Sequence, residues 1–174
     1  MDRDAWKRYD SSGSWFYEIH DTGFKYNLSD VHAAIGVAQL KRADELMRRR
    51  QAIAKAYNEA FRNDPALEIP VTEPGVVHAW HLYVLRLKPS ALKISRNHFI
   101  EVLRERGVGT SVHCIPLNTM AFYQNRYGYR TGDFPIAEDV YSRCLSLPIF
   151  PAMSDEDVAY VVESVLMAAR ENRR

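Results

Sequence analysis

Three consecutive residues, Lys25, Tyr26 and Asn27, have the types and spacing that could bind an anion. They stand just before Ser29, a preferred helix N-cap, so free backbone N–H groups and the positive end of a helix dipole are expected beside them. The lysine would add a full positive charge and the asparagine a neutral amide donor, which together suit a phosphate. The same residues also fit an ordinary solvated lysine beside a capping asparagine, because most helix N-termini bind no ligand.

The histidines and cysteines do not indicate a metal site. His78 and His81 are the only close histidine pair, and in a strand their three-residue separation sends the side chains to opposite faces. Cys114 and Cys144 lie in apolar, strand-like runs, so we expect two buried free thiols rather than a disulfide.

Charge and hydropathy exclude two classes of partner. The net charge is +1 and the sequence pI is about 7.8, whereas a nucleic-acid-binding domain is usually strongly basic. The run 48–50 of three arginines therefore fits a solvated helix face. No stretch approaches the ~18 apolar residues of a membrane span, and no signal peptide opens the chain, so we expect a cytoplasmic protein.

The element that must position the Lys25 segment is the longest helical signal in the chain. No proline occurs between Ser29 and Pro65, so the sequence predicts one helix of roughly 33 residues, or about 50 Å. Its first half offers a surface of small residues for close packing: Ala33, Ala34, Gly36, Val37 and Ala38. Its second half carries an apolar stripe: Leu46, Ile53, Tyr57, Ala60 and Phe61. We expect the first half to pack tightly and the second to carry a domain.

Residue composition and periodicity divide the chain into three parts. Residues 1–22 are aromatic-rich without a periodic pattern and predict an arm that packs on a partner surface. Residues 23–63 form a turn and the long helix, and residues 64–174 predict a small α+β domain. Its expected strands are Trp80–Leu87, which is apolar on both faces and hence central, Gly109–Ile115 and Leu145–Phe150, after a short extended piece at 67–71. One expected helix has Ser95 as its cap, a short one runs from Asn118 or Thr119 through Tyr127, and a third spans Pro135–Cys144 with Asp133 as its cap. The last has Ser154 as its cap, where Asp157 completes a capping box.

Five segments in order resemble the C-terminal part of the DegT/DnrJ/EryC1/StrS aminotransferases. They are GFKYNLSDVHAAIGVAQL, RRRQAIAKAY, HAWHLYVLRL, RERGVGTSVHCIPL and YGYRTGDFPIAEDVYSRCLSLPIFPAMSDEDV. Each is weak alone, but the ordered set is specific and covers residues 1 to 172. The KYN motif departs from the family's commoner NYR form and is similar to the subgroup that contains the UDP-4-amino-4-deoxy-L-arabinose aminotransferase.

The resemblance implies the small C-terminal domain of a fold-type I pyridoxal-phosphate (PLP) transferase. It implies a long helix followed by a small, mainly antiparallel sheet of about three strands with helices packed on it. The PLP-binding domain, with the lysine that forms the Schiff base and the acidic partner of the pyridinium nitrogen, would lie upstream. None of the six lysines matches the Schiff-base motif: Lys7, Lys25, Lys41, Lys55, Lys88 and Lys93. No catalytic residue is therefore assigned, and the chain alone is expected to be inactive.

The resemblance also implies binding residues. In the family, an asparagine before the long helix crosses a dimer interface and contacts the PLP phosphate of the neighbouring subunit. That asparagine falls on Lys25 by position, while the asparagine of this sequence is Asn27, so either could make the contact. His113, in TSVHC, corresponds to a family histidine near the expected nucleotide-sugar, and Tyr26 is a weaker substrate candidate. A strand-end histidine bonded to backbone is an equally good reading of His113.

Two classes of function therefore compete. The favoured one is part of a homodimeric PLP-dependent aminotransferase that converts a nucleotide-linked keto sugar to an amino sugar, with glutamate as donor, for surface polysaccharide synthesis. The alternatives are a non-catalytic dimerisation or interaction domain derived from that fold, and a PLP-dependent sugar dehydratase of the same family.

Overall fold

The computed structural model describes residues 21–174, so the aromatic residues of the predicted arm before residue 21 lie outside the described part. The chain divides into two compact units, Met1–Lys41 and Arg42–Arg174. Helix α1 (Asp30–Leu40) belongs to the first unit, and every other helix and strand described here belongs to the second.

The stretch predicted as one helix is two helices, α1 and α2 (Ala43–Phe61). Ser29 is the N-cap of α1 as predicted, and its Oγ accepts a hydrogen bond from the His32 N–H. A turn at Lys41 and Arg42 separates the two helices. Arg42 stays in the right-handed region but, with φ −105° and ψ −2°, departs from ideal helix values. The prediction of an unbroken helix is wrong here, since neither glycine nor proline marks the turn in the sequence.

The apolar stripe of α2 forms one wall of the core. Ile53, Tyr57 and Phe61 are buried, as the spacing predicts. The Tyr57 ring meets the edge of Tyr83 at 5.0 Å between centroids, and its hydroxyl donates to the Pro148 carbonyl at 2.8 Å. The Tyr83 hydroxyl donates to Asn58 Oδ1 at 2.8 Å. Both buried phenols therefore have partners.

The three-stranded sheet is antiparallel with the order β1–β2–β3, where β1 is Leu67–Glu68, β2 is Tyr83–Leu87 and β3 is Cys144–Leu147. The predicted central position of β2 and the antiparallel α+β fold are confirmed. The strand begins at Tyr83 rather than Trp80, because Trp80 has φ 49°, outside the extended region.

The predicted strand Gly109–Ile115 does not form. Only Ser111 pairs with the sheet, through a two-bond bridge to Ser146, and the chain then leaves the sheet edge. The side chains of 113–115 are exposed, so no second layer covers this segment and its apolar composition does not make it a strand. That prediction is wrong.

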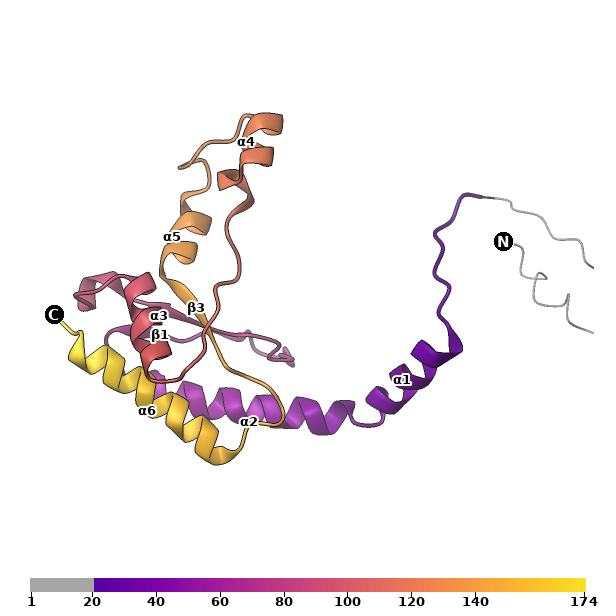
Figure 1. The fold of residues 1–174 in the computed structure, drawn as a ribbon, viewed down its shortest axis with the longest axis horizontal. Coiled ribbons are helices and arrows are strands. Elements are labelled where there is room, and N and C mark those ends of the chain that lie inside the picture. The colour runs from indigo at the N-terminus through magenta and orange to yellow at the C-terminus, as the bar shows by residue number, and fades with distance from the viewer. Residues whose placement is uncertain (1–20) are drawn as a thin grey trace, which may run out of the picture. The chain divides into compact units, whose positions relative to one another are not determined.

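Helices α2 and α6 (Asp155–Glu171) lie side by side under one face of the sheet (Figure 1). Helix α3 (Arg96–Glu105) packs against α6 and β3. The caps follow the sequence: Ser95 caps α3, Gly107 has φ 75° just after it, and Ser154 with Asp157 makes the predicted capping box of α6. Two short 3-10 turns lie at Pro89–Ala91 and Leu117–Thr119.

Helices α4 (Ala121–Tyr127) and α5 (Pro135–Arg143) have no buried residue. The predicted cap Asp133 does not precede α5 directly; Phe134 holds that position, and Asp133 Oδ2 accepts the Arg130 N–H at 2.7 Å. The predicted start of α4 at Asn118 or Thr119 is too early by two or three residues, because that pair belongs to the 3-10 turn. Within residues 21–174, no helix is long and apolar enough to cross a membrane.

Candidate functional site

The second face of the sheet carries the polar side chains of Arg86 and Ser146 beside Val84 and Cys144, and is called the polar face below. In the register of β2 and β3, Tyr83 and Leu85 oppose Leu147 and Leu145 on the core side. The alternate pairs, Val84 with Ser146 and Arg86 with Cys144, must then point to the opposite face.

His113 is tied to this polar face. Its Nδ1 lies 3.0 Å from Ser146 Oγ, and Ser146 is buried. Because both groups can donate or accept, Ser146 fixes the ring while Nε2 stays available for another hydrogen bond. The alternative of a histidine bonded only to backbone is not what the structure shows, since the partner is a serine side chain.

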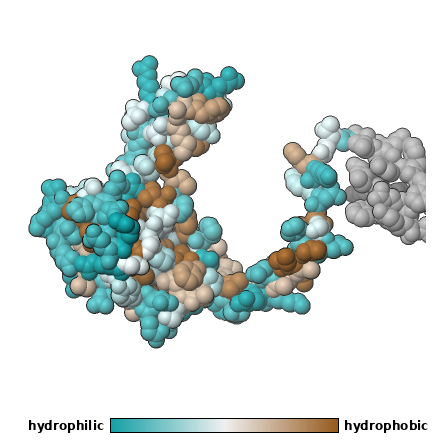
Figure 2. Space-filling view, viewed as in Figure 1, coloured by the Kyte–Doolittle hydropathy of each residue, from teal (hydrophilic) through white to brown (hydrophobic). Residues whose placement is uncertain are grey.

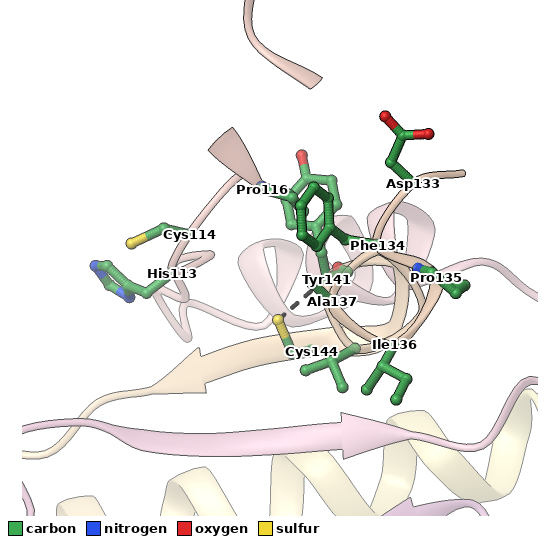
Figure 3. A pocket seen from close by; sticks show the side chains of 11 residues that line it. His113, Cys114, Pro116, Asp133, Phe134, Pro135, Ile136, Ala137, Tyr141 and Cys144 are labelled. Atoms are coloured by element: carbon green, nitrogen blue, oxygen red, sulfur yellow. Dashed lines mark hydrogen bonds between the residues drawn. The ribbon is translucent and has the colours of Figure 1, made fainter. Parts of the chain in front are cut away.

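His113 lines a groove of about 640 Å³ between the chain segment at 113–116 and helix α5. Figure 3 shows His113 and Cys114 on one side of it and Phe134 on the side of α5. The lining residues are His113, Cys114, Pro116, Asp133, Phe134, Pro135, Ile136, Ala137, Val140, Tyr141 and Cys144. Such a volume suits a small-molecule ligand, with apolar walls for ring carbons and an imidazole for a hydroxyl or phosphate. The groove lining contains no lysine.

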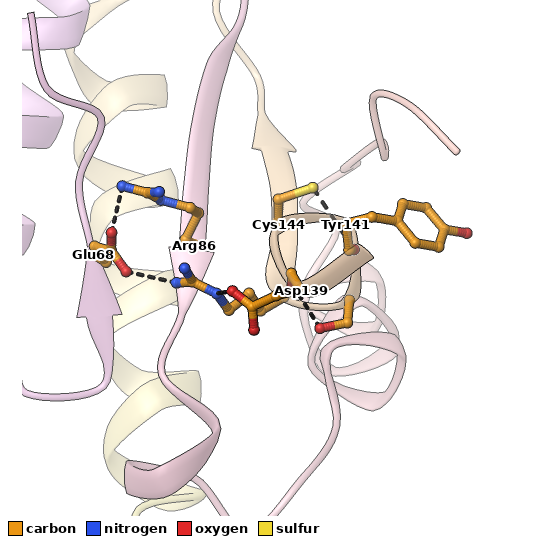
Figure 4. Close-up of polar contacts among 7 residues, drawn as sticks. Glu68, Arg86, Asp139, Tyr141 and Cys144 are labelled. Carbon is orange, nitrogen blue, oxygen red and sulfur yellow. Dashed lines mark hydrogen bonds and ion pairs between the residues drawn. The ribbon is translucent and has the colours of Figure 1, made fainter. Parts of the chain in front are cut away.

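A chain of ion pairs fixes α5 to the sheet beside the groove (Figure 4). Glu68 on β1 pairs with Arg86 on β2 and, at 2.6 Å, with Arg143 at the end of α5. Arg143 Nε also bonds to Asp139 at 2.8 Å. These hydrogen bonds, to Asp139 first and to Glu68 second, raise the pKa of Arg143. The sequence marks Arg143 only weakly, because its second carboxylate partner, Glu68, is 75 residues away.

Lys25, Tyr26 and Asn27 belong to the first unit and His113 to the second. The three residues are exposed, and none of them makes a hydrogen bond or ion pair with the described residues. Tyr26 lies 5.8 Å from Phe24 between ring centroids. Within residues 21–174, no contact occupies the ammonium of Lys25 or the amide of Asn27, while Ser29 Oγ accepts the His32 N–H of α1.

The two cysteines are free, as predicted, but only Cys144 is buried. Cys114 is exposed because its segment leaves the sheet, so the expectation of a buried thiol is wrong there. No cluster of three metal-binding side chains occurs in the part of the chain that the structure describes.

Comparison with known proteins identifies the family to which this fold belongs. The model of the DegT/DnrJ/EryC1/StrS aminotransferase family matches residues 1–166, and the chain belongs to this family. The family resemblance in the sequence motifs is confirmed.

Three relatives illustrate the similarity. MJ1066 of Methanocaldococcus jannaschii, an uncharacterized protein, is 52% identical over 99% of this chain. SpsC of Bacillus subtilis, a spore coat polysaccharide biosynthesis protein, is 45% identical over 95%. A proposed sugar aminotransferase of Streptococcus pneumoniae, Spr1654, is similar in structure over 90% of this chain and 39% of its own, with a TM-score of 0.78 and 28% identity. Structures of Spr1654 include PLP and PMP forms.

The chain spans less than half the length of the curated relatives it matches, 45% of MJ1066 and 43% of SpsC.

Proposed function

We propose that this chain is the C-terminal portion of a PLP-dependent aminotransferase that converts a nucleotide-linked keto sugar to an amino sugar, with glutamate as donor. The observation that carries the proposal is the family match over residues 1–166. The similarity to SpsC, whose name places it in spore coat polysaccharide biosynthesis, supports an amino sugar for a surface polysaccharide.

Lys25 and Asn27 would hold the phosphate of PLP across the subunit boundary of a homodimer. Both are exposed, and neither donates to a described residue, so their N–H groups would reach a phosphate without giving up a contact within residues 21–174. When bound, PLP supplies an electron sink for the negative charge that develops on the substrate carbon. The chain's own contribution is to orient the cofactor, and the catalytic lysine belongs to the part of the enzyme upstream of this match.

His113 would orient the sugar. With Nδ1 fixed by Ser146, Nε2 can hydrogen bond to a sugar hydroxyl or phosphate oxygen, and the apolar groove walls can contact the ring carbons. Tyr26 is proposed as a second substrate contact, since its exposed phenol can donate and accept.

The test is an assay of the whole enzyme with PLP, glutamate and a panel of nucleotide-linked keto sugars. Formation of 2-oxoglutarate together with an amino sugar is the expected result. Release of a deoxy sugar without 2-oxoglutarate would identify a dehydratase instead. No PLP binding and no turnover in the whole enzyme would favour a non-catalytic interaction domain.

A further inference from the structure

Ser146 is a polar residue in an otherwise apolar strand. Every residue of β3 is buried, and Ser146 is only 4% exposed. Its backbone is fixed on both sides, since it pairs with Val84 on β2 and exchanges two hydrogen bonds with Ser111, at 2.7 and 3.2 Å. The hydroxyl therefore has a defined position, and its burial costs free energy unless it is hydrogen bonded.

The partner of this hydroxyl is His113. Ser146 Oγ lies 3.0 Å from His113 Nδ1, and within residues 21–174 this is the one hydrogen bond of Oγ. A serine hydroxyl carries a single proton. If Nδ1 carried the ring proton, it would donate to Oγ, and the buried hydroxyl proton would have no acceptor among the described residues. If Nδ1 carries no proton, it accepts the one from Ser146, and both groups are satisfied.

The direction of this bond decides what the other ring nitrogen does. In a neutral imidazole only one nitrogen carries a proton, so acceptance at Nδ1 puts the proton on Nε2. His113 is exposed and lines the groove, whereas Ser146 is buried beneath it, so Nε2 is the nitrogen that can meet a ligand. The groove is therefore offered a hydrogen-bond donor.

We propose that Ser146 is a positioning residue that holds His113 as the Nε2–H tautomer, so that the imidazole donates to an acceptor oxygen of the substrate. The recognised atom is an oxygen with a free lone pair, either on the sugar or on the phosphates attached to it. Ser146 acts through His113. The identity of the ligand rests on the proposed function, whereas the tautomer follows from the contacts of the chain itself.

The first test is nitrogen NMR of isotope-labelled histidine in the 174-residue chain, at about pH 8.5, where imidazole is ordinarily neutral. The ring nitrogen shifts distinguish a protonated from an unprotonated nitrogen, and the His113 signals are identified by their loss in His113→Gln. We expect His113 to carry its proton on Nε2 alone. A wild-type ring with the proton on Nδ1, or with both tautomers populated, would overturn the proposal.

Variants of Ser146 then test the source of the tautomer. Ser146→Ala should show both tautomers of His113, because the hydroxyl that selects one of them is gone. Ser146→Thr, which keeps the hydroxyl, should keep the wild-type spectrum. The matched control is Ser111→Ala, which changes the opposite residue of the bridge but leaves its backbone bonds in place. If Ser146→Ala keeps a single Nε2–H tautomer, Ser146 does not set it.

The second test measures steady-state kinetics of the whole enzyme. Ser146→Ala should raise the KM for the nucleotide-linked sugar about threefold or more and leave the KM for glutamate unchanged, and Ser146→Thr should restore the wild-type value. A nucleoside diphosphate without the sugar serves as inhibitor: equal weakening of its binding places the accepting oxygen on the phosphates, and unchanged inhibition places it on the sugar. An unchanged KM for the sugar substrate in Ser146→Ala would overturn the positioning role.

The two tests separate this inference from the proposed function. The NMR measurement needs neither PLP nor turnover, so it decides the tautomer of His113 even if the whole enzyme does not transfer an amino group.

Discussion

Lys25 and Asn27 offer different kinds of hydrogen bond to the same anion. An ammonium–phosphate contact is charge-assisted, whereas an amide contributes a neutral donor, so the two side chains should differ in their effect on PLP binding. Asp30, in the first turn of α1, opposes an anion at this position. The positive charge of Lys25 therefore matters more than the helix terminus alone would suggest.

We expect Lys25→Ala in the whole enzyme to weaken PLP binding by about 1.5–3 kcal/mol and Asn27→Ala by about 1 kcal/mol. PLP dissociation constants from absorbance titration measure both. The control is Lys55→Ala, since Lys55 lies on α2 and pairs with Glu59. If neither Lys25→Ala nor Asn27→Ala changes the constant by more than about threefold, or ~0.7 kcal/mol, the two residues do not hold the phosphate.

At the scale of elements, α5 depends on Glu68 for its attachment to the sheet. The side chains of Arg143 and Glu68 are 17% and 34% exposed. Removal of the Glu68 carboxylate would leave the largely buried guanidinium groups of Arg143 and Arg86 without this partner. We predict that Glu68→Gln lowers the free energy of unfolding by about 1–2 kcal/mol, measured by urea denaturation. Glu101→Gln, which breaks an exposed pair on α3, should cost under ~0.5 kcal/mol. Equal effects of the two changes would show that the Glu68 network stabilises nothing beyond a surface pair.

The two core tyrosines make the folded state less stable at high pH. Burial raises the pKa of Tyr57, and burial together with the nearby charge of Tyr57 raises the pKa of Tyr83. Below the ordinary tyrosine pKa of about 10, both states keep the proton and stability is unaffected. Above it, the unfolded chain loses protons that the folded chain retains, so stability falls.

We therefore expect the urea midpoint of the wild type to fall between about pH 10 and 11.5 more steeply than that of Tyr83→Phe. At pH 7 the variant should lose about 1 kcal/mol, because Asn58 Oδ1 loses its donor. The same pH series for Tyr160→Phe controls for exposed phenols. Parallel curves for the wild type and Tyr83→Phe would contradict the assignment.

Local signals in the sequence predicted the elements that depend on caps and periodicity. Ser95, Gly107 and the Ser154–Asp157 box were all placed correctly, because capping needs only neighbouring residues. The turn at Lys41 and the edge segment after Gly109 were not predicted, since each depends on what packs there and not on residue type.

The candidate site was only partly visible for the same reason. The His113 motif pointed to its region, but the Ser146 contact joins residues that are distant in the sequence. The phosphate role proposed for Lys25 and Asn27 rests on the family resemblance, because spacing alone left it open.

At the scale of the whole molecule, α1 carries an apolar surface that its own unit does not bury. Helix α1 has no buried residue, and Val31, Ile35 and Leu40 are 70%, 56% and 75% exposed. Figure 2 shows hydrophobic side chains on its surface. A helix of 11 residues is also too short to be stable in water without packing. Its apolar face therefore needs a partner surface, which we propose is the large domain and the second subunit of the whole enzyme.

We expect the isolated 174-residue chain to self-associate or to lose the structure of α1. Sedimentation velocity across a range of concentrations measures association, and hydrogen exchange of the amides in 30–40 measures fraying. The double change Val31→Glu and Ile35→Glu should abolish association, because it places charges on the apolar face, while Val76→Glu and Val77→Glu in an exposed turn should leave it unchanged. A chain that stays monomeric at every concentration, with protected α1 amides, would contradict the expectation that this face is a contact surface.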